Sequence, residues 1–497
     1  MKQPKAVKGI KIAEPLIFEK SRRGRSGSSI PCEDFGPLES PIPDSMRRGE
    51  LAALPDVGEP EVVRHFVRLS TLNYGVDSGL YPLGSCTMKY NPKINEVACS
   101  LPGFTHIHPY FPESFVQGAL QLMYELEGYL AEISGMDGVT LQPAAGAHGE
   151  FAGIRVIRAA LEKKGQKRRK VLVPDTAHGT NPASCTLNGF DSVEVKSGER
   201  GVLKAEDVAR VMDSDVAALM VTNPNTLGLF EENIAAIAAV VHEKGGYMYA
   251  DGANLNALMG MARPGDLGFD VIQFNLHKTF ATPHGGGGPG SGPVGVKKDL
   301  VPFLPIPRIA KDGDLYRLVT DGPDSIGRVR AFMGNFLVMV RAYTYIRQLG
   351  GEGLKKATQM AVLNANYVLS RIRSTYHIPF DRTCMHECVA TDQGLKKHGV
   401  TNVDVAKGLI DRGFHPPTVS FPINVHGALM IEPTETETVE EIDRFVAALN
   451  EIAEIAAANP QALHDAPTMT HVSRPDDAYA ARYLLLTADM HEDGKAE

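Results

Sequence analysis

Apolar segments of strand length alternate with amphipathic helical patterns from about residue 115 to residue 275. This alternation predicts a mostly parallel sheet covered by helices on both faces, with ligands bound at the carboxyl ends of its strands. The chain is therefore expected to have an α/β fold. The periodicity predicts helices over 114–133, 149–162 and 231–244, and strands over 139–142, 171–173, 216–222 and 271–274, with a further strand ending at Asp251.

The pattern changes after about residue 320. Two helical segments, 331–349 and 352–373, precede strand-like segments and a helix that Thr438 and Glu441 open as a capping box. This order predicts a smaller α+β C-terminal domain. The first 60 or so residues, rich in Pro, Gly and Ser, are either disordered or an arm across a neighbouring subunit, and we favour the arm. The expected parts are an N-terminal arm over 1–65, a large domain over 66–325, a small domain over 326–462 and a tail over 463–497.

The overall composition excludes several classes of protein. The net charge is −8 over 497 residues and no dense Lys/Arg stripe is present, which argues against a nucleic-acid surface. No run of about 18 apolar residues suggests a membrane span, and the N-terminus lacks the apolar segment of a signal peptide. The six cysteines are scattered, which indicates reduced thiols in a cytosolic protein.

A lysine follows the apolar strand 271–274 and precedes the glycine-rich loop 283–290. Lys278 is expected to be poorly solvated there, so its amine can attack a carbonyl. Asp251 ends the preceding strand. An acid and a lysine on neighbouring strands suit pyridoxal phosphate: the lysine forms the Schiff base, and the acid keeps the pyridine nitrogen protonated. We therefore predict Lys278 and Asp251 as catalytic residues and add Asn254 and His277 as cofactor-binding neighbours.

A turn of small residues joins the strand at 139–142 to the following helix. The backbone N–H groups of Ala145, Gly146 and Ala147 can point at a phosphate from the start of that helix. His148 can lie flat on an aromatic cofactor, which makes it a third catalytic candidate. The alternative interpretation is a tight turn with a surface histidine.

Three other segments have both a functional and a structural interpretation. Asn223 follows a strand and can hydrogen-bond the phenolic oxygen of a pyridoxal ring, or it is part of an ordinary Asn-Pro turn. Thr180, after the strand at 171–173, reaches the same end of the sheet or caps local structure. The glycine run 285–288 is not followed by Gly-Lys-Ser/Thr, so it is no P-loop. It leaves room for the cofactor or a bulky second substrate, or it is a tightly packed connection.

Two short segments invite a metal interpretation. These are His106 to His108 and Cys384 to Cys388, the second of which includes His386 and Glu387. Neither has a matching second pair of ligands at zinc spacing, so we predict no metal site.

Long motifs in this chain are similar to those of one enzyme family. The segment 275–296, NLHKTFATPHGGGGPGSGPVGV, resembles the lysine segment of the pyridoxal-dependent glycine decarboxylases, the P proteins of the glycine cleavage system. The resemblance covers nearly the whole chain, which looks like the carboxyl-terminal half of the single-chain form, a half that many bacteria make as a separate subunit. The other matching motifs are YPLGSCTMKYNP at 81–92, QPAAGAHGE at 142–150, AHGTNPAS at 177–184, DGANLNA at 251–257, SIGRVRAFMGNF at 325–336 and HPPTVSFP at 415–422.

The resemblance implies fold type I, the aspartate-aminotransferase-like fold, with pyridoxal 5'-phosphate as cofactor. It implies decarboxylation of glycine and transfer of the aminomethyl group to the lipoyl group of the H carrier protein. A companion chain, subunit 1 of the P protein, would supply the missing half in a cytoplasmic α2β2 heterotetramer. Lys278, His178 or His277 would move protons, and the sequence does not choose among them. The alternatives are an aminotransferase or amino-acid decarboxylase of the same fold, or a non-catalytic structural subunit.

Overall fold

The computed structural model describes residues 14–25, 27, 42–49, 54–285, 288, 290–484 and 486. Gly286 and Gly287 of the glycine run, and much of the predicted arm and tail, lie outside these ranges. The chain divides into two compact units, one of residues 1–75 with 467–497 and one of residues 76–466. None of the helices in the described part of the chain is both long enough and apolar enough to cross a membrane.

The smaller unit is built around one helix, α1 (Glu59–Ser70). The Gly58 amide donates to the Glu61 side chain at 3.0 Å and so satisfies one of the free donors at the start of the helix. His65 is the buried residue of α1, and its Nδ1 lies 2.9 Å from the Glu14 carboxylate. The unit also contains η1 (Ile17–Lys20), η2 (Asp44–Met46) and α14 (Asp477–Arg482).

The larger unit contains a seven-stranded sheet in the order β1-β7-β6-β5-β4-β2-β3. The pairs from β6 to β3 are all parallel, whereas β7 runs antiparallel to both of its neighbours. The predicted mostly parallel sheet is therefore confirmed. The strands are β1 (Gly138–Thr140), β2 (Lys170–Pro174), β3 (Asp191–Val195), β4 (Val216–Thr222), β5 (Tyr247–Gly252), β6 (Val271–Phe274) and β7 (Val294–Val296).

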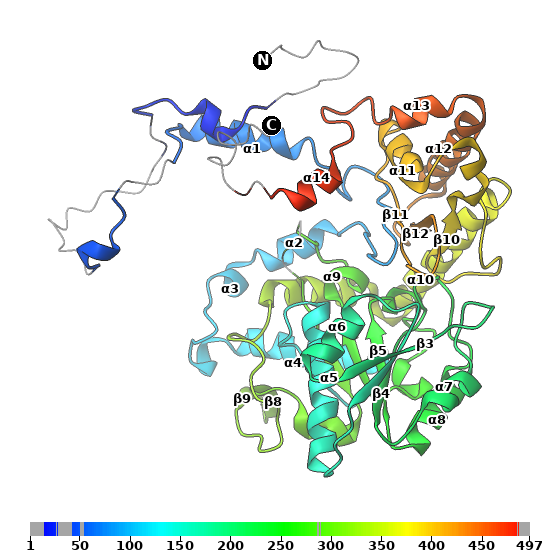
Figure 1. Cartoon of the computed structure of the whole chain (residues 1–497). Coiled ribbons are helices and arrows are strands. Elements are labelled where there is room, and N and C mark those ends of the chain that lie inside the picture. The colour runs from blue at the N-terminus through cyan, green and yellow to red at the C-terminus, as the bar shows by residue number, and fades with distance from the viewer. Residues whose placement is uncertain are drawn as a thin grey trace. The chain divides into compact units, whose positions relative to one another are not determined.

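Helices cover both faces of this sheet (Figure 1). Successive side chains of a strand point to opposite faces. In β4, Leu219 and Val221 therefore join one core, while Ala218 and Met220 join the other. The first core includes α4 (Gln117–Ser134), α7 (Ala205–Val211), α8 (Ile234–Glu243) and the first half of α10 (Phe336–Ile372), and the second includes α5 (Gly146–Lys163) and α6 (Thr180–Leu187).

A second, antiparallel sheet in the order β10-β12-β11 has a core of its own, which confirms the smaller α+β part. Gly350 has a φ of +62° and interrupts α10, so the two predicted helices form one segment broken at that glycine. Thr438 caps the helix α12 by accepting the Glu441 amide at 3.3 Å, as the capping box predicts. The elements are β10 (Cys388–Thr391), β11 (Thr418–Val419), β12 (Ala428–Ile431), α11 (Asn402–Asp411), α12 (Val439–Ala458) and α13 (Pro460–His464).

The connections hold short elements that the periodicity did not predict. The hairpin of β8 and β9 follows the large sheet, and α9 follows β6 directly. These elements are α2 (Lys93–Cys99), α3 (Pro102–Thr105), η3 (Glu113–Phe115), η4 (Leu255–Ala257), η5 (Pro264–Leu267), α9 (Leu276–Thr279), η6 (Lys298–Phe303), β8 (Arg308–Asp312), β9 (Leu315–Val319), η7 (Asp392–Gly394) and η8 (Lys396–His398).

Candidate active site

A cavity of about 260 Å³ lies at the carboxyl ends of β4, β5 and β6, next to the start of α5. Its volume is just below the range of about 300–1,000 Å³ that is usual for small-molecule sites. Among the predicted site residues, it brings together Ala145, Gly146, Ala147, Thr180, Asp251, His277 and Lys278. Its other lining residues are Ser85, Glu150, His178, Thr222, Thr226, Ala253 and Asn275.

Lys278 lies in the single turn of α9, directly after β6. Its Nζ donates a hydrogen bond of 2.8 Å to the carbonyl oxygen of Ser85. The end of the buried strand thus places the amine in the cavity, as the sequence predicts for a lysine at that position.

Asp251 lies near the end of β5 and is 4% exposed. Its carboxylate accepts hydrogen bonds from the Ala253 amide at 3.0 Å, from Asn181 Nδ2 at 3.1 Å and from the side-chain amide of Gln273. The Thr222 hydroxyl lies 3.5 Å from the same carboxylate. These donors match a negative charge and hold the group in one orientation.

Glu150, for which no role was predicted, is a second buried acid in the cavity. It accepts hydrogen bonds from the Thr180 hydroxyl at 2.8 Å and from Asn181 Nδ2 and the Ser184 hydroxyl at 3.1 Å each. Burial, followed by the charge of Asp251, raises the pKa of Glu150. Glu150 lies one helical turn after Gly146, and this spacing was a local signal that could have placed it on the same face.

The start of α5 forms one wall of the cavity. Ala145 precedes the helix and has no side chain able to cap it. No described side chain caps the N–H groups of the first turn, so these groups can meet an anion. A Cβ atom added to Gly146 would lie 2.5 Å from the side-chain amide of Asn275, so a larger residue would require that side chain to move. The geometry suits the phosphate-binding turn predicted for Ala145 to Ala147.

Three predicted residues do not line this cavity. His148 Nδ1 accepts the Ala144 amide at 3.1 Å, and the Asn223 side-chain oxygen accepts the Glu231 amide at 3.0 Å. Asn254 donates to the Pro224 carbonyl at 2.9 Å. All three hydrogen-bond to nearby backbone, and their contacts with the cofactor stay a prediction. Two other histidines, His178 and His277, line the cavity.

Three histidines near Lys278 have pKa values below that of an isolated imidazole. Burial, then the charges of His284 and Lys278, lower the pKa of His277 to about 3. Burial and the charge of Lys278 lower the pKa of His284 to about 4, and the two rings lie 5.3 Å apart. Burial also lowers the pKa of His178, with Lys278 acting in the same direction. His277 and His284 are therefore neutral at physiological pH.

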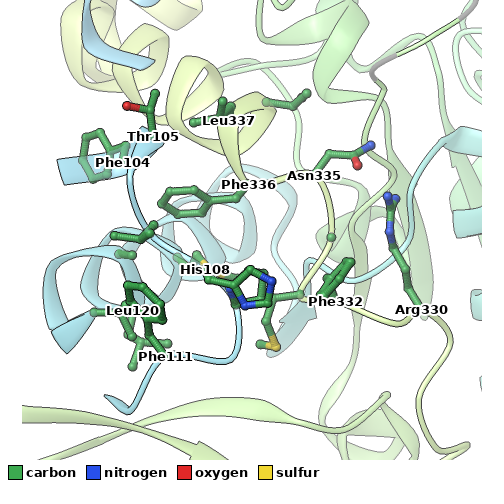
Figure 2. Close-up of a pocket in the computed structure, with 18 of the residues that line it drawn as sticks. Phe104, Thr105, His108, Phe111, Leu120, Arg330, Phe332, Asn335, Phe336 and Leu337 are labelled. Carbon is green, nitrogen blue, oxygen red and sulfur yellow. The ribbon is translucent and has the colours of Figure 1, made fainter. Parts of the chain in front are cut away.

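A larger cavity of about 560 Å³ lies near the turn at residues 145–147. Figure 2 shows aromatic side chains gathered around it. Its lining includes His108 and the rings of Phe104, Phe111, Phe332 and Phe336. Asn335, which also lines it, donates to the Ala144 carbonyl at 3.2 Å and to the Gly290 carbonyl. Arg330 contributes a buried Nη1 with no hydrogen-bond partner among the described residues. The cavity is thus mostly apolar, with two arginines, Arg330 and Arg341, in its lining.

Comparisons with known proteins agree with this fold. Residues 357–471 match the family model described as "Glycine dehydrogenase, C-terminal domain". A solved structure of glycine decarboxylase (P-protein) of the glycine cleavage system, in inhibitor-bound form, superposes with a TM-score of 0.70 at 20% identity, covering 83% of this chain and 93% of that one. A NifS-like protein superposes with a TM-score of 0.57 at 16% identity, covering 76% of this chain and 100% of that one. The chain has fold type I, as the resemblance implied.

Relatives in sequence extend over nearly the whole chain. The probable glycine dehydrogenase (decarboxylating) subunit 2 of Chlorobium chlorochromatii is 58% identical over 96% of this chain and 99% of its own length. The corresponding protein of Listeria monocytogenes is 55% identical over 95% of this chain and 97% of its own length. With a buried aspartate and a lysine facing one cavity in a fold of this type, the chain belongs to the family of glycine dehydrogenase (decarboxylating) subunit 2 proteins.

Proposed function

We propose that this chain is the catalytic subunit of a two-subunit P protein. It decarboxylates glycine with pyridoxal 5'-phosphate and transfers the aminomethyl group to the lipoyl group of the H carrier protein. The names of the relatives support glycine as the substrate. The observation that carries the proposal is the meeting of Lys278, Asp251 and the first turn of α5 in one cavity.

The residues of the cavity fit this cofactor. The free N–H groups of Ala145 to Ala147 would hold its phosphate, and Lys278 would hold its carbonyl carbon. Bound there, pyridoxal phosphate supplies an electron sink for the bond that breaks at the substrate's α-carbon. Asp251, held by its hydrogen-bond donors, would keep a proton on the pyridine nitrogen. His178, which lines the cavity, would lie against the ring.

The surroundings of the histidines narrow the choice of proton-transfer group. A general base works best when its pKa lies near the working pH. The pKa of His277 is about 3 because of burial and the neighbouring charges, so that imidazole is a poor base. Lys278 and His178 remain as the groups that move protons at the α-carbon.

The large apolar cavity supports a route for the carrier protein. A lipoyl group is a disulfide ring on an apolar acyl arm, and the rings of Phe332 and Phe336 offer it an apolar wall (Figure 2). Asn335 joins this cavity to the Ala144 carbonyl, one residue before the phosphate turn. The arm would approach the reacting carbon along this side of the turn.

The assembly and location are further parts of the proposal. The family name, subunit 2, supports a companion subunit, and we propose two copies of each chain in a cytoplasmic α2β2 complex. We also propose the domain boundaries near residues 65, 325 and 462. Light scattering of the co-expressed chains would give the stoichiometry, and limited proteolysis would test the boundaries.

Release of labelled CO2 from carboxyl-labelled glycine tests the function. The assay combines this chain, the companion subunit, pyridoxal phosphate and lipoylated carrier protein. We expect release that depends on the lipoyl group, with unlipoylated carrier and a Lys278→Ala variant as controls. Failure to release CO2 with every component present would refute the assigned reaction. Full carrier-dependent release by this chain alone would refute the need for a partner.

A further inference from the structure

The backbone at Ser85 to Thr87, which accepts a hydrogen bond from the Lys278 amine, has an unusual conformation. Ser85, whose carbonyl oxygen lies 2.8 Å from Lys278 Nζ, has a φ of +64°, and Thr87 has a φ of +45°. Residues other than glycine rarely adopt such angles, and they keep them only where surrounding contacts enforce the conformation. Some part of the structure must therefore hold this segment in place.

Two buried carboxylates make those contacts. Glu387 Oε2 accepts the Ser85 amide at 2.7 Å, and Glu432 Oε2 accepts the Thr87 amide at 3.0 Å. The two acids lie just beyond one end of the antiparallel ladder of β10 and β12, next to the pair of Cys388 and Ile431. The ladder therefore places Glu387 and Glu432 side by side, and neither side chain is exposed.

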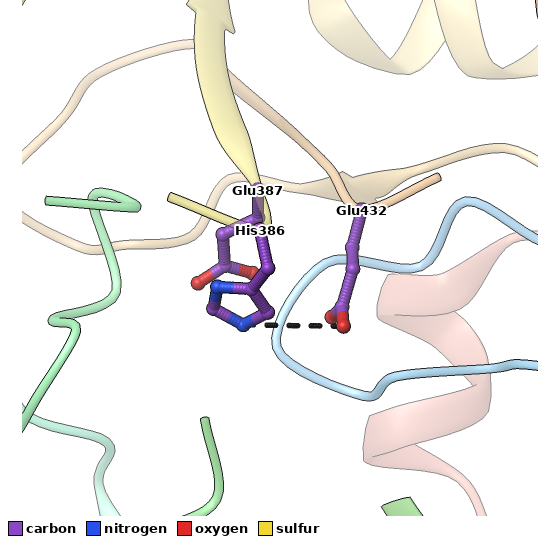
Figure 3. A group of neighbouring side chains, drawn as sticks. All are labelled: His386, Glu387 and Glu432. Carbon is purple, nitrogen blue, oxygen red and sulfur yellow. Dashed lines mark ion pairs between the residues drawn. The ribbon is translucent and has the colours of Figure 1, made fainter. Parts of the chain in front are cut away.

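His386 completes the cluster (Figure 3). Its Nε2 lies 3.9 Å from Glu432 Oε1, and one ligand atom from each of the three residues lies within 4.8 Å of the others. Burial lowers the pKa of His386 to about 3, so the imidazole is neutral. This spacing would also admit a metal ion, although Cys384 and Cys388, considered with His386 in the sequence, are not part of the group.

The surrounding charges favour a cluster that binds backbone amides over one that binds a metal ion. Burial raises the pKa of Glu432, while the Thr87 contacts and the charges of Lys278 and Lys89 oppose that rise. Cationic partners are thus already near the cluster. Each carboxylate also uses one oxygen for a backbone amide, which is what holding the segment requires.

We propose that Glu387 and Glu432 are positioning residues for Lys278. By accepting the Ser85 and Thr87 amides, they keep the Ser85 carbonyl where it accepts the Lys278 amine whenever that amine is not bonded to the cofactor. The significance of this contact rests on the proposed function, in which glycine displaces the lysine and the lysine must later return. A lysine held at a fixed acceptor is already close to the geometry in which it reacts.

Substitutions at Glu432 separate the hydrogen bond from the charge. Glu432→Gln removes the charge but keeps an oxygen for the Thr87 amide, whereas Glu432→Met removes both. Glu432→Asp keeps the charge and withdraws the oxygen by one methylene. The corresponding Gln and Met variants of Glu387 test the Ser85 amide in the same way.

The readout is the reactivity of the Lys278 amine in the full-length chain prepared without cofactor. The chain is acetylated across a pH range, and peptide mass spectrometry gives the pH at half-labelling for Lys278. A carbonyl acceptor stabilises the charged amine, so its loss should move this midpoint about one pH unit lower in the Met variants than in the Gln variants. Lys196, whose side chain is 84% exposed, is the internal control.

The Asp variant decides the question if the Met variants do not fold, as judged by circular dichroism. Its midpoint of Lys278 labelling should shift as in the Met variant, because the shorter side chain withdraws the acceptor while keeping the charge. Equal midpoints in the Gln and Met variants, or a shift in Gln with none in Asp, would overturn the proposal. So would one equivalent of a divalent metal in the purified holoenzyme that every variant loses. Labelling involves neither glycine nor carrier, so its result is independent of the proposed reaction.

Discussion

The side-chain amide of Asn181 lies between the two buried acids of the cavity. Its Nδ2 donates to Asp251 Oδ2 and to Glu150 Oε2, at 3.1 Å each. The Asn181 oxygen has no hydrogen-bond partner among the described residues. A single amide therefore couples the proposed partner of the pyridine nitrogen to an acid for which no role was predicted.

Changing either acid to its amide should destabilise the chain. In Asp251→Asn, an N–H group replaces the oxygen that faces Asn181, and a buried donor without an acceptor costs about 1–3 kcal/mol. Asn181 could rotate its amide, but its oxygen would then face the Glu150 carboxylate. Glu150→Gln creates the same conflict, partly offset because it removes the repulsion between the two acids. We expect each single variant to lose up to about 1–3 kcal/mol of unfolding free energy.

The double variant should recover part of that loss. With both acids converted to amides, a rotated Asn181 offers its oxygen to both new N–H groups. The effects of Asp251→Asn and Glu150→Gln should therefore fall short of additivity by about 1 kcal/mol, within the range of roughly 0.5–3 kcal/mol found for residues in one network.

Urea unfolding of the cofactor-free, full-length chain at alkaline pH measures this coupling. Circular dichroism and tyrosine fluorescence are the suitable probes because the chain has no tryptophan. Glu162→Gln, at an exposed position of the same helix, replaces Glu150→Gln in the control cycle and should be additive with Asp251→Asn. Additivity within about 0.3–0.5 kcal/mol for the Glu150 cycle would refute the shared amide.

Three further predictions concern the same cavity. Lys278→Ala should abolish attachment of the cofactor that borohydride makes permanent, and peptide mapping that finds the label on another lysine would contradict the assignment. Gly146→Ala should weaken cofactor binding in equilibrium dialysis, because its Cβ would lie 2.5 Å from Asn275 Oδ1, whereas Gly128→Ala, with no atom within 4 Å of its added Cβ, should bind as the parent does. Burial and the charge of Asp251 raise the pKa of folded Glu150, so the stability from its protonated form is present at low pH and is lost as the pH rises through the raised value. The unfolding free energy of Glu150→Gln, relative to that of the parent chain, should therefore increase as the pH rises. Urea unfolding curves from acid to alkaline pH measure this difference, and a difference that does not change with pH would contradict the prediction.

Local periodicity was enough to predict most of the large sheet. The strands over 216–222 and 271–274 have the expected bounds, because each is a continuous apolar run buried on both faces. Helix starts were less predictable, since α5 begins three residues before the expected start at 149 and α10 five residues after the expected start at 331. These ends depend on backbone turns and packing as well as on the pattern of side chains.

The sequence by itself determined that Lys278 and Asp251 lie at the same edge of a sheet, because parallel strands all end on one side. Only the tertiary structure decided which other groups meet them. Glu150 and His178 line the cavity, and Ser85 reaches Lys278 from 193 residues away. The physical reason is that strand and helix patterns reflect neighbours along the chain, whereas the partners of a buried amine are set by long-range packing. No local pattern around Ser85 could have shown that carboxylates from another sheet hold its backbone in place.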